Sequence, residues 1–132
     1  MTAPVIRVSA AVIVDDAGRL LVVRKRGTDR FMNPGGKPEQ GESAAETLVR
    51  ELAEELGVTV APGDLRPLGC YTTDAANEAG HVLVADCFAL RLGPAATEAR
   101  AEIAELRWIT EAEASALPLA PLIEVLRPHI WG

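Results

Sequence analysis

The sequence predicts an α/β fold with a mixed sheet. Strand-like runs rich in Val, Leu and Ile alternate along the chain with segments of helical periodicity, which is typical of α/β proteins. The chain has 132 residues, of which 48% are hydrophobic and 24% charged, as in a globular protein with a substantial core. We therefore expect one domain over residues 1–132.

The N-terminal part is predicted to form a β-hairpin. Residues 8–14 and 20–24 are apolar strand-like runs, and Asp15-Asp16-Ala17-Gly18 between them supplies turn chemistry. The first run is too short to span a membrane and lacks the cleavage pattern of a secretory signal. We therefore expect no membrane partner and a mature chain that starts near Met1.

The best-marked element is a helix over residues 44–56. Ser43 and Glu46 form a capping box that marks its start, and Gly57 stands where a glycine ends a helix. Apolar residues recur between them at the spacing of an amphipathic helix. These positions are Ala45, Leu48, Leu52 and Leu56.

Three strands and another helix are expected after residue 57. Strand candidates cover residues 65–73, 81–92 and 105–109, and a helix is expected near residues 119–126. Pro67 and Gly69 interrupt the first of these strands, which predicts an edge position or a β-bulge there.

Net charge and cysteine content limit the function. The formal net charge of −6 argues against a protein that binds duplex nucleic acid, since such proteins need a basic face. An acidic protein can still bind a phosphate substrate when divalent metal ions bridge the two. Cys70 and Cys87 could face each other across a hairpin, but the sequence favours two reduced core thiols in a cytoplasmic protein.

The predicted helix also has an acidic face. Glu54 and Glu55 follow Glu51 by three and four residues, so the three carboxylates lie on one side. The like-charge pair Glu51 and Glu55 costs about 0.2–0.5 kcal/mol, which Arg50 offsets in part through Glu46 and Glu54. Clustered carboxylates suit a hard cation such as Mg²⁺. Spacing alone leaves two interpretations open, a solvated acidic face and a metal site.

Two glycines precede this helix. Gly35 and Gly36 allow close approach of a ligand to the backbone or a positive φ, and a carbonyl of this turn could complete a metal shell. A simple tight turn is the alternative. The segment does not match the phosphate loop of P-loop proteins.

From Gly36 to Val58 the chain reads GKPEQGESAAETLVRELAEELGV. This run resembles the Nudix box, in which a glycine, five residues, a glutamate and seven residues precede Arg-Glu-aliphatic-any-Glu-Glu-any-Gly-aliphatic. The chain is similar to MutT-like single-domain members of the Nudix hydrolase family, which implies an α/β/α sandwich with a mixed sheet. The resemblance also implies metal-dependent hydrolysis of a diphosphate bond in a nucleoside diphosphate linked to another group. Every defined position is filled, by Gly36, Glu42, Arg50, Glu51, Leu52, Glu54, Glu55, Gly57 and Val58.

The resemblance assigns roles within the box. It implies that Glu54 and Glu55 bind catalytic Mg²⁺, with Mn²⁺ as an expected substitute, and that Gly36 offers its carbonyl to the metal. Glu51 either joins the metal shell or acts as the general base. Two residues are expected to orient the carboxylates or to act as outer ligands, Glu42 and Arg50.

A further acidic residue is expected before the last strand. Many family members supply it from a loop ahead of a strand that ends in Trp, and Glu102 lies six residues before Trp108. Glu102 is therefore a candidate metal ligand and an alternative general base, with Glu98 and Glu105 as competitors.

Four residues are candidates for substrate binding. Arg24, favoured over its two basic neighbours, and Lys37 are expected to contact phosphate. Phe31 is expected to pack either on a base or on the core. Asn33 stands where relatives often have an apolar residue, and its side chain is a candidate for the pocket.

The sequence does not identify the substrate. In the family branch that clears oxidised guanine nucleotides, an Asn in a late Pro-rich segment often recognises the base, but segment 117–121 of this chain contains no Asn. The ADP-ribose branch often has a Pro midway through the strands after the box, but this chain has no Pro between Pro67 and Pro94. The main alternative function is a non-catalytic nucleotide sensor, although every glutamate of the box is present. The charge of −6 disfavours RNA decapping. A homodimer is expected from the resemblance alone.

Overall fold

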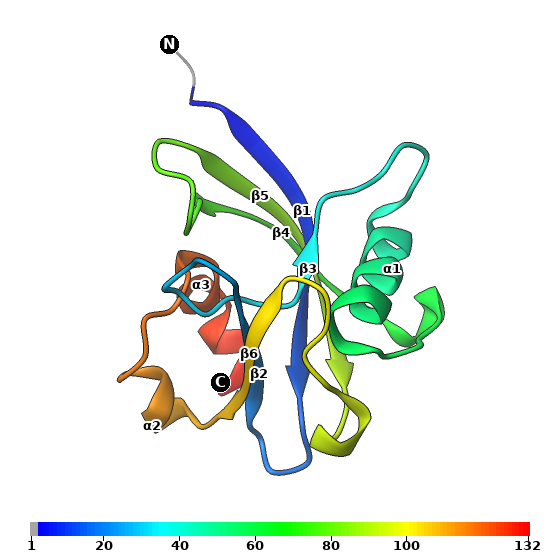
Figure 1. Ribbon diagram of the computed structural model, residues 1–132, viewed down its shortest axis with the longest axis vertical. Helices are drawn as coiled ribbons and strands as arrows, with labels where there is room; N and C mark the ends of the chain where they lie inside the picture. Colours follow the sequence, from blue (N-terminus) through cyan, green and yellow to red (C-terminus); the bar gives the residue numbers. More distant parts are fainter. Residues whose placement is uncertain (1–2) are drawn as a thin grey trace.

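The computed structural model describes residues 3–132 (Figure 1). Met1, where we expect the mature chain to start, and Thr2 lie outside the described residues. In the described part, six strands form one sheet with the order β4-β5-β1-β2-β6, and β3 pairs with β1 beside this path. The strands are β1 (Val5–Val14), β2 (Leu20–Lys25), β3 (Gly35–Gly36), β4 (Arg66–Asp74), β5 (Val82–Arg91) and β6 (Ile103–Ile109).

The sheet is mixed, as predicted. Strand β1 runs parallel to β5 and antiparallel to β2 and β3. The helices are α1 (Ala44–Leu56), α2 (Glu111–Ala114) and α3 (Pro121–Ile130), with short 3₁₀ turns at Pro62–Asp64 and Pro94–Ala96.

Helices α1 and α3 cover opposite faces of the sheet (Figure 1). Successive side chains of β1 and β2 point to opposite faces, so both strands are buried on both sides. One core lies under α1 and contains Ala11, Ile13, Leu21, Val23, Leu48, Leu52 and Leu56. The other lies under α3 and contains Ala10, Val12, Leu20, Val22, Phe31, Ile123 and Leu126. This arrangement confirms the α/β/α sandwich.

Helix α1 has the predicted bounds. The Ser43 side chain accepts from the Glu46 backbone N–H, Glu46 returns the bond to Ser43, and Gly57 ends the helix at φ 69°. Leu48 and Leu52 have no solvent exposure. Burial of each stabilises the fold by roughly 1.5–3 kcal/mol. The apolar face therefore fixes the direction in which the acidic face points.

The N-terminal hairpin and the edge strand also agree with the sequence. Asp15 holds the β1–β2 turn, because its Oδ1 accepts from the backbone N–H groups of Ala17 and Arg19. Strand β4 lies at the edge of the sheet, and its register with β5 shifts between Pro67 and Gly69.

The bounds of three predicted elements were wrong, and one helix was not predicted. Strand β1 begins at Val5, three residues before the predicted start at residue 8. Strand β6 begins at Ile103, two residues before the predicted start, because it continues its pairing with β2 past a register shift at Lys25. Helix α3 starts at Pro121, which is favoured at the first helical position, and it extends to Ile130. The short helix α2 was not predicted, although Thr110 and Glu113 form a capping box there.

The two cysteines were predicted only in part. Both are free thiols, but Cys70 is exposed and Cys87 is buried, so only Cys87 belongs to the core. They do not face each other across the β4–β5 pair, because the shifted register places Cys70 opposite Asp86 and Cys87 opposite Gly69. Within residues 3–132, no helix is long and apolar enough to cross a membrane.

Candidate active site

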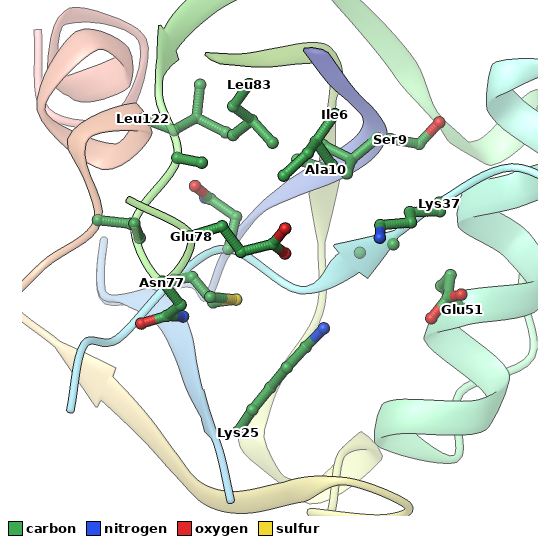
Figure 2. Close-up of a pocket in the computed structure, with 18 of the residues that line it drawn as sticks. Ile6, Ser9, Ala10, Lys25, Lys37, Glu51, Asn77, Glu78, Leu83 and Leu122 are labelled. Carbon is green, nitrogen blue, oxygen red and sulfur yellow. The ribbon is translucent and has the colours of Figure 1, made fainter. Parts of the chain in front are cut away.

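A cavity of about 720 Å³ lies beside β1, β3, α1 and the β4–β5 loop (Figure 2). One part, the acidic end, is lined by Glu51, Glu54 and Glu102 together with Lys25 and Lys37. The other part, the apolar end, is lined by Ile6, Val8, Leu83, Ala120, Pro121 and Leu122. The cavity thus joins a charged region to a hydrophobic region, as a site for an amphipathic ligand does.

The two glycines of β3 bring the loop against both β1 and α1. A side chain at Gly35, where φ is 151°, would collide with the backbone carbonyl of Ser9. A side chain at Gly36 would collide with the Glu51 carboxylate. The Pro34 carbonyl accepts from the Ala11 N–H at 2.8 Å and fixes the loop to β1. Close packing therefore requires glycine at both positions.

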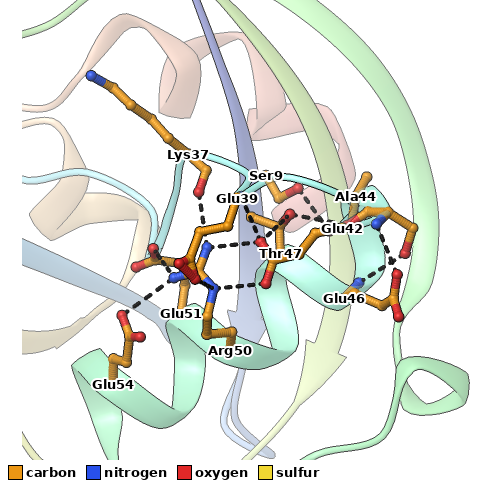
Figure 3. Close-up of polar contacts among 11 residues, drawn as sticks. Ser9, Lys37, Glu39, Glu42, Ala44, Glu46, Thr47, Arg50, Glu51 and Glu54 are labelled. Atoms are coloured by element: carbon orange, nitrogen blue, oxygen red, sulfur yellow. Dashed lines mark hydrogen bonds and ion pairs between the residues drawn. The ribbon is translucent and has the colours of Figure 1, made fainter.

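Arg50 holds the carboxylates of the acidic end in place (Figure 3). Its Nε and Nη2 donate to the two oxygens of Glu42 at 2.8 and 2.9 Å, and its Nη1 donates to Glu51 Oε1 at 2.8 Å. The Nη1 group also lies 3.4 Å from Glu54 Oε2. The hydrogen bonds from Arg50 lower the pKa of Glu42 to about 2. Glu42 and Arg50 thus occupy the orienting positions that the resemblance implies.

Two details of this network differ from the prediction. Glu46 does not pair with Arg50, because its side chain is bound to the Ser43 N–H in the capping box. Glu39, which was not predicted, lies 3.0 Å from Arg50 Nε. The Arg50 Nη2 also donates to the Lys37 carbonyl at 2.9 Å, so Arg50 ties the glycine loop to α1.

Glu55 is the buried member of the acidic face. It is 1% exposed; its Oε1 accepts from the Gly35 N–H at 3.0 Å, and its Oε2 has no hydrogen-bond partner among the described residues. Burial raises the pKa of Glu55 to about 8. Burial also raises the pKa of Glu51. The fold therefore keeps two carboxylates in surroundings that oppose their ionisation.

These groups fit a hard divalent cation. Within residues 3–132, the acidic, His and Cys side chains form no group of three already gathered around one point. The available donors are nevertheless carboxylate oxygens, which Mg²⁺ prefers, and they include the unpartnered Oε2 of Glu55. A cation there would favour the ionised form of Glu55, which burial alone disfavours. The residues able to hold it are Glu51, Glu54, Glu55 and the backbone of Gly36.

Glu102 lies at the acidic end, unlike its two competitors. It lines the cavity, and its carboxylate lies 3.4 Å from Lys25 Nζ. Glu98 instead pairs with Arg100, and Glu105 pairs with Arg24 and Arg107. The loop before β6 therefore brings a fourth carboxylate toward α1.

Two of the four predicted substrate-binding residues line the cavity, Lys37 and Asn33. Arg24 does not line it, because its guanidinium binds Glu105 and the Thr28 carbonyl. Lys25 lines the cavity instead, since alternation along β2 places it on the same face as Leu21 and Val23, under α1. We therefore replace Arg24 by Lys25 as the basic residue of this strand.

Phe31 packs in the core under α3. It is 4% exposed, and the guanidinium of Arg107 lies 5.3 Å from its ring centroid. Of the two alternatives for Phe31, the structure thus supports core packing.

Sequence reasoning missed the apolar end and the loop beside it. Residues 74–78 of the β4–β5 connection line the cavity, including Asn77 and Glu78. Alternation along β1 places Ile6 on the same face as Val8, which is a usable signal. No sequence signal showed that the loop lies over this face.

A family model described as the NUDIX domain matches residues 4–129. This match covers most of the chain, which therefore belongs to the Nudix hydrolase family. Two curated relatives match shorter stretches. The RNA pyrophosphohydrolase of Halorhodospira halophila (strain DSM 244 / SL1) is 40% identical over 58 residues, which are 44% of this chain and 31% of that protein. The nucleoside diphosphate-linked moiety X motif 6 protein of Xenopus laevis is 42% identical over 53 residues, 39% of this chain and 24% of that protein.

The chain spans less than two thirds of the length of the curated relatives it matches. Solved structures agree over more of the chain. The Escherichia coli ORF135 protein has a TM-score of 0.68 and 28% identity, covering 95% of this chain and 92% of that one. The NUDIX domain of Shewanella oneidensis NrtR has a TM-score of 0.74 and 22% identity, covering 98% and 90%, and it supports the fold alone.

Proposed function

We propose that this protein is a Mg²⁺-dependent pyrophosphohydrolase, with Mn²⁺ as a substitute, that cleaves the diphosphate bond of a nucleoside diphosphate linked to another group. One observation carries the proposal. The complete Nudix box places Glu51, Glu54 and the glycine loop together at the charged end of a cavity that continues into a hydrophobic end. Such a cavity suits a diphosphate at one end and a nucleoside at the other.

The basic side chains at the acidic end have different roles. Lys25 and Lys37 neutralise phosphate oxygens of the substrate, and Arg50 keeps the carboxylates in position through the contacts described above. Glu54, Glu55 and the Gly36 carbonyl would hold the cation, which when bound would supply acidification of a water and neutralisation of negative charge on the phosphate oxygens.

A carboxylate takes the proton from the attacking water. Glu51 and Glu102 are the two candidates, since both line the cavity at this end. Glu51 rests against Gly36 and has a raised pKa because of burial, which suits a proton acceptor near neutral pH. Glu102 is more exposed and is paired with Lys25.

Names of similar proteins support the reaction class. One is an RNA pyrophosphohydrolase, and a solved structure with 26% identity, covering 83% of this chain and 53% of that one, is a UDP-X diphosphatase with a TM-score of 0.65. We favour a small nucleotide over RNA as the substrate, because the net charge of −6 disfavours a long polyanion. A cytoplasmic location, based on the two reduced cysteines, and a homodimer, based on the family resemblance alone, remain part of this proposal.

The test is a substrate panel assayed with Mg²⁺, with Mn²⁺ and with EDTA. The panel contains nucleoside triphosphates, ADP-ribose, sugar nucleotides and dinucleoside polyphosphates, and phosphate or diphosphate release is followed. We expect cleavage of one class that EDTA abolishes. Glu54→Gln should lower kcat/KM by roughly 10²–10⁴-fold, whereas the exposed Glu111→Gln on α2 should leave it unchanged. Full turnover by Glu54→Gln, or silence of folded protein across the panel, would contradict the proposal.

A further inference from the structure

Asn33 has a buried hydrogen-bond acceptor without a partner and lies beside the cavity. Its side chain is 6% exposed, and the residue lines the cavity. Its Nδ2 donates to the Ala11 carbonyl at 3.1 Å, while its Oδ1 has no partner among the described residues. A carbonyl can only accept, so Ala11 fixes the amide with its nitrogen toward β1. The group of Asn33 left for a ligand is therefore an acceptor.

Glu78 adds a second acceptor from the β4–β5 loop. Figure 2 shows its carboxylate directed into the cavity, between the side chains of the apolar end and Lys37. Glu78 takes part in none of the ion pairs formed by residues 3–132. An ionised carboxylate accepts hydrogen bonds and cannot donate. Its neighbour in the loop, Asn77, also lines the cavity.

The walls near these acceptors are apolar. Ile6 and Leu83 from neighbouring strands and Leu122 from α3 face the cavity (Figure 2). Apolar walls with a few convergent acceptors suit a planar ring that carries N–H donors on its edge. The phosphates would then lie at the acidic end, beside Lys25 and Lys37.

We infer that Asn33 and Glu78 select nucleotides whose base carries an exocyclic amino group, namely cytosine, adenine or guanine, over those with uracil or thymine. This inference rests on the proposed function and names the substrate class of the same site. An amino group donates to Asn33 Oδ1 or to the Glu78 carboxylate. An amino group carries two N–H donors, whereas uracil and thymine offer a single ring N–H beside a keto oxygen. One of the two acceptors, the buried Asn33 Oδ1 or the exposed Glu78 carboxylate, then faces the keto oxygen and stays unpaired, which disfavours binding of the keto base.

The test compares nucleotides in which a keto oxygen replaces the amino group and the adjacent ring nitrogen gains a hydrogen. Turnover of CTP against UTP, and of ATP against ITP, is measured with Mg²⁺. The wild type should prefer the amino member by roughly 10-fold or more in kcat/KM. Asn33→Leu and Glu78→Gln should each lower this ratio at least about threefold, while Glu111→Gln should leave it at the wild-type value. A substitution that only disturbs the structure should lower kcat/KM equally for both nucleotides of a pair, so the ratio would not change.

Equal kcat/KM within both pairs, or a ratio unchanged in both variants, would overturn the inference while leaving hydrolysis intact. A preference that follows ribose against deoxyribose in place of the base would also overturn it. Absence of all turnover would instead contradict the proposed function. Base selection is then read from calorimetric binding of CMP and UMP, which needs no turnover. Tighter binding of CMP would support the inference, and equal Kd values would overturn it.

Discussion

The acidic and apolar ends of the cavity hold their polar groups in opposite ways. At the acidic end, one guanidinium binds Glu42, Glu51 and Glu54, so these three carboxylates are fixed by the protein itself, and only the buried Glu55 keeps an oxygen without a partner among the described residues. At the apolar end, Asn33 Oδ1 lacks a hydrogen-bond partner and Glu78 lacks an ion-pair partner among the described residues. From this difference we infer that the acidic end carries out the reaction and that the apolar end determines which substrate binds.

The largest effect at the acidic end is expected from substitution of the general base. Glu51→Gln should lower kcat by roughly 10²–10⁴-fold, because a positioned proton acceptor contributes about that much. The loss in Glu102→Gln should be smaller, since that carboxylate is more exposed and is paired with Lys25. Single-turnover rates of both variants measure the effect, and the preference among bases should stay at its wild-type value in each. A reversed order of the two losses would make Glu102 the base.

Arg50 offers the next largest effect. Arg50→Lys keeps the charge but loses the planar fork that binds both oxygens of Glu42, so turnover should fall about 10- to 100-fold. Because Arg50 positions the carboxylates, the Mg²⁺ concentration that gives half-maximal rate should also rise. The rate is therefore measured as a function of Mg²⁺ concentration. Wild-type activity and Mg²⁺ dependence in this variant would show that the network has no positioning role.

Substitutions at the apolar end should weaken substrate binding and leave the rate of the chemical step nearly unchanged. Leu83→Ala removes part of the wall, and we expect KM to rise roughly fivefold with little change in kcat. Steady-state kinetics on the preferred substrate separates the two constants. A loss confined to kcat would mean that the two ends do not act independently.

Glu55 makes the stability of the metal-free protein depend on pH. Burial raises its folded pKa from an ordinary 4.5 to about 8, so above pH 4.5 the unfolded chain is ionised while the folded protein still holds the proton. In EDTA, the free energy of unfolding should therefore fall as pH rises from 4.5 to about 8. Urea unfolding across this range measures the fall, which Glu55→Gln should reduce and Mg²⁺ should offset. A flat profile for the wild type would contradict the assigned environment of Glu55.

The sequence predicted the acidic end well for a physical reason. Its groups lie on one helix and in the loop directly before it, so spacing along the chain translates into spacing in the fold. The capping box at Ser43, the apolar stripe and Gly57 fixed the bounds of α1 and the direction of its acidic face. Local signals were sufficient there.

The apolar end could not be predicted in the same way. Its residues come from β1, the β4–β5 loop, β5 and the start of α3, and only tertiary packing brings them together. The choice between Arg24 and Lys25 is different, because alternation along β2 places Lys25 on the same face as Leu21 and Val23, under α1, and this signal was not used.

The proposed function requires that a divalent cation binds between the glycine loop and the acidic face of α1. The most direct measurement is nuclear magnetic resonance of ¹⁵N-labelled protein with substoichiometric Mn²⁺, whose paramagnetism broadens nearby signals. The account predicts broadening of the backbone amides of Gly36 and Glu51–Glu55, with those of α2 unaffected, and loss of the effect in Glu54→Gln. Broadening centred elsewhere, or unchanged in Glu54→Gln, would contradict it.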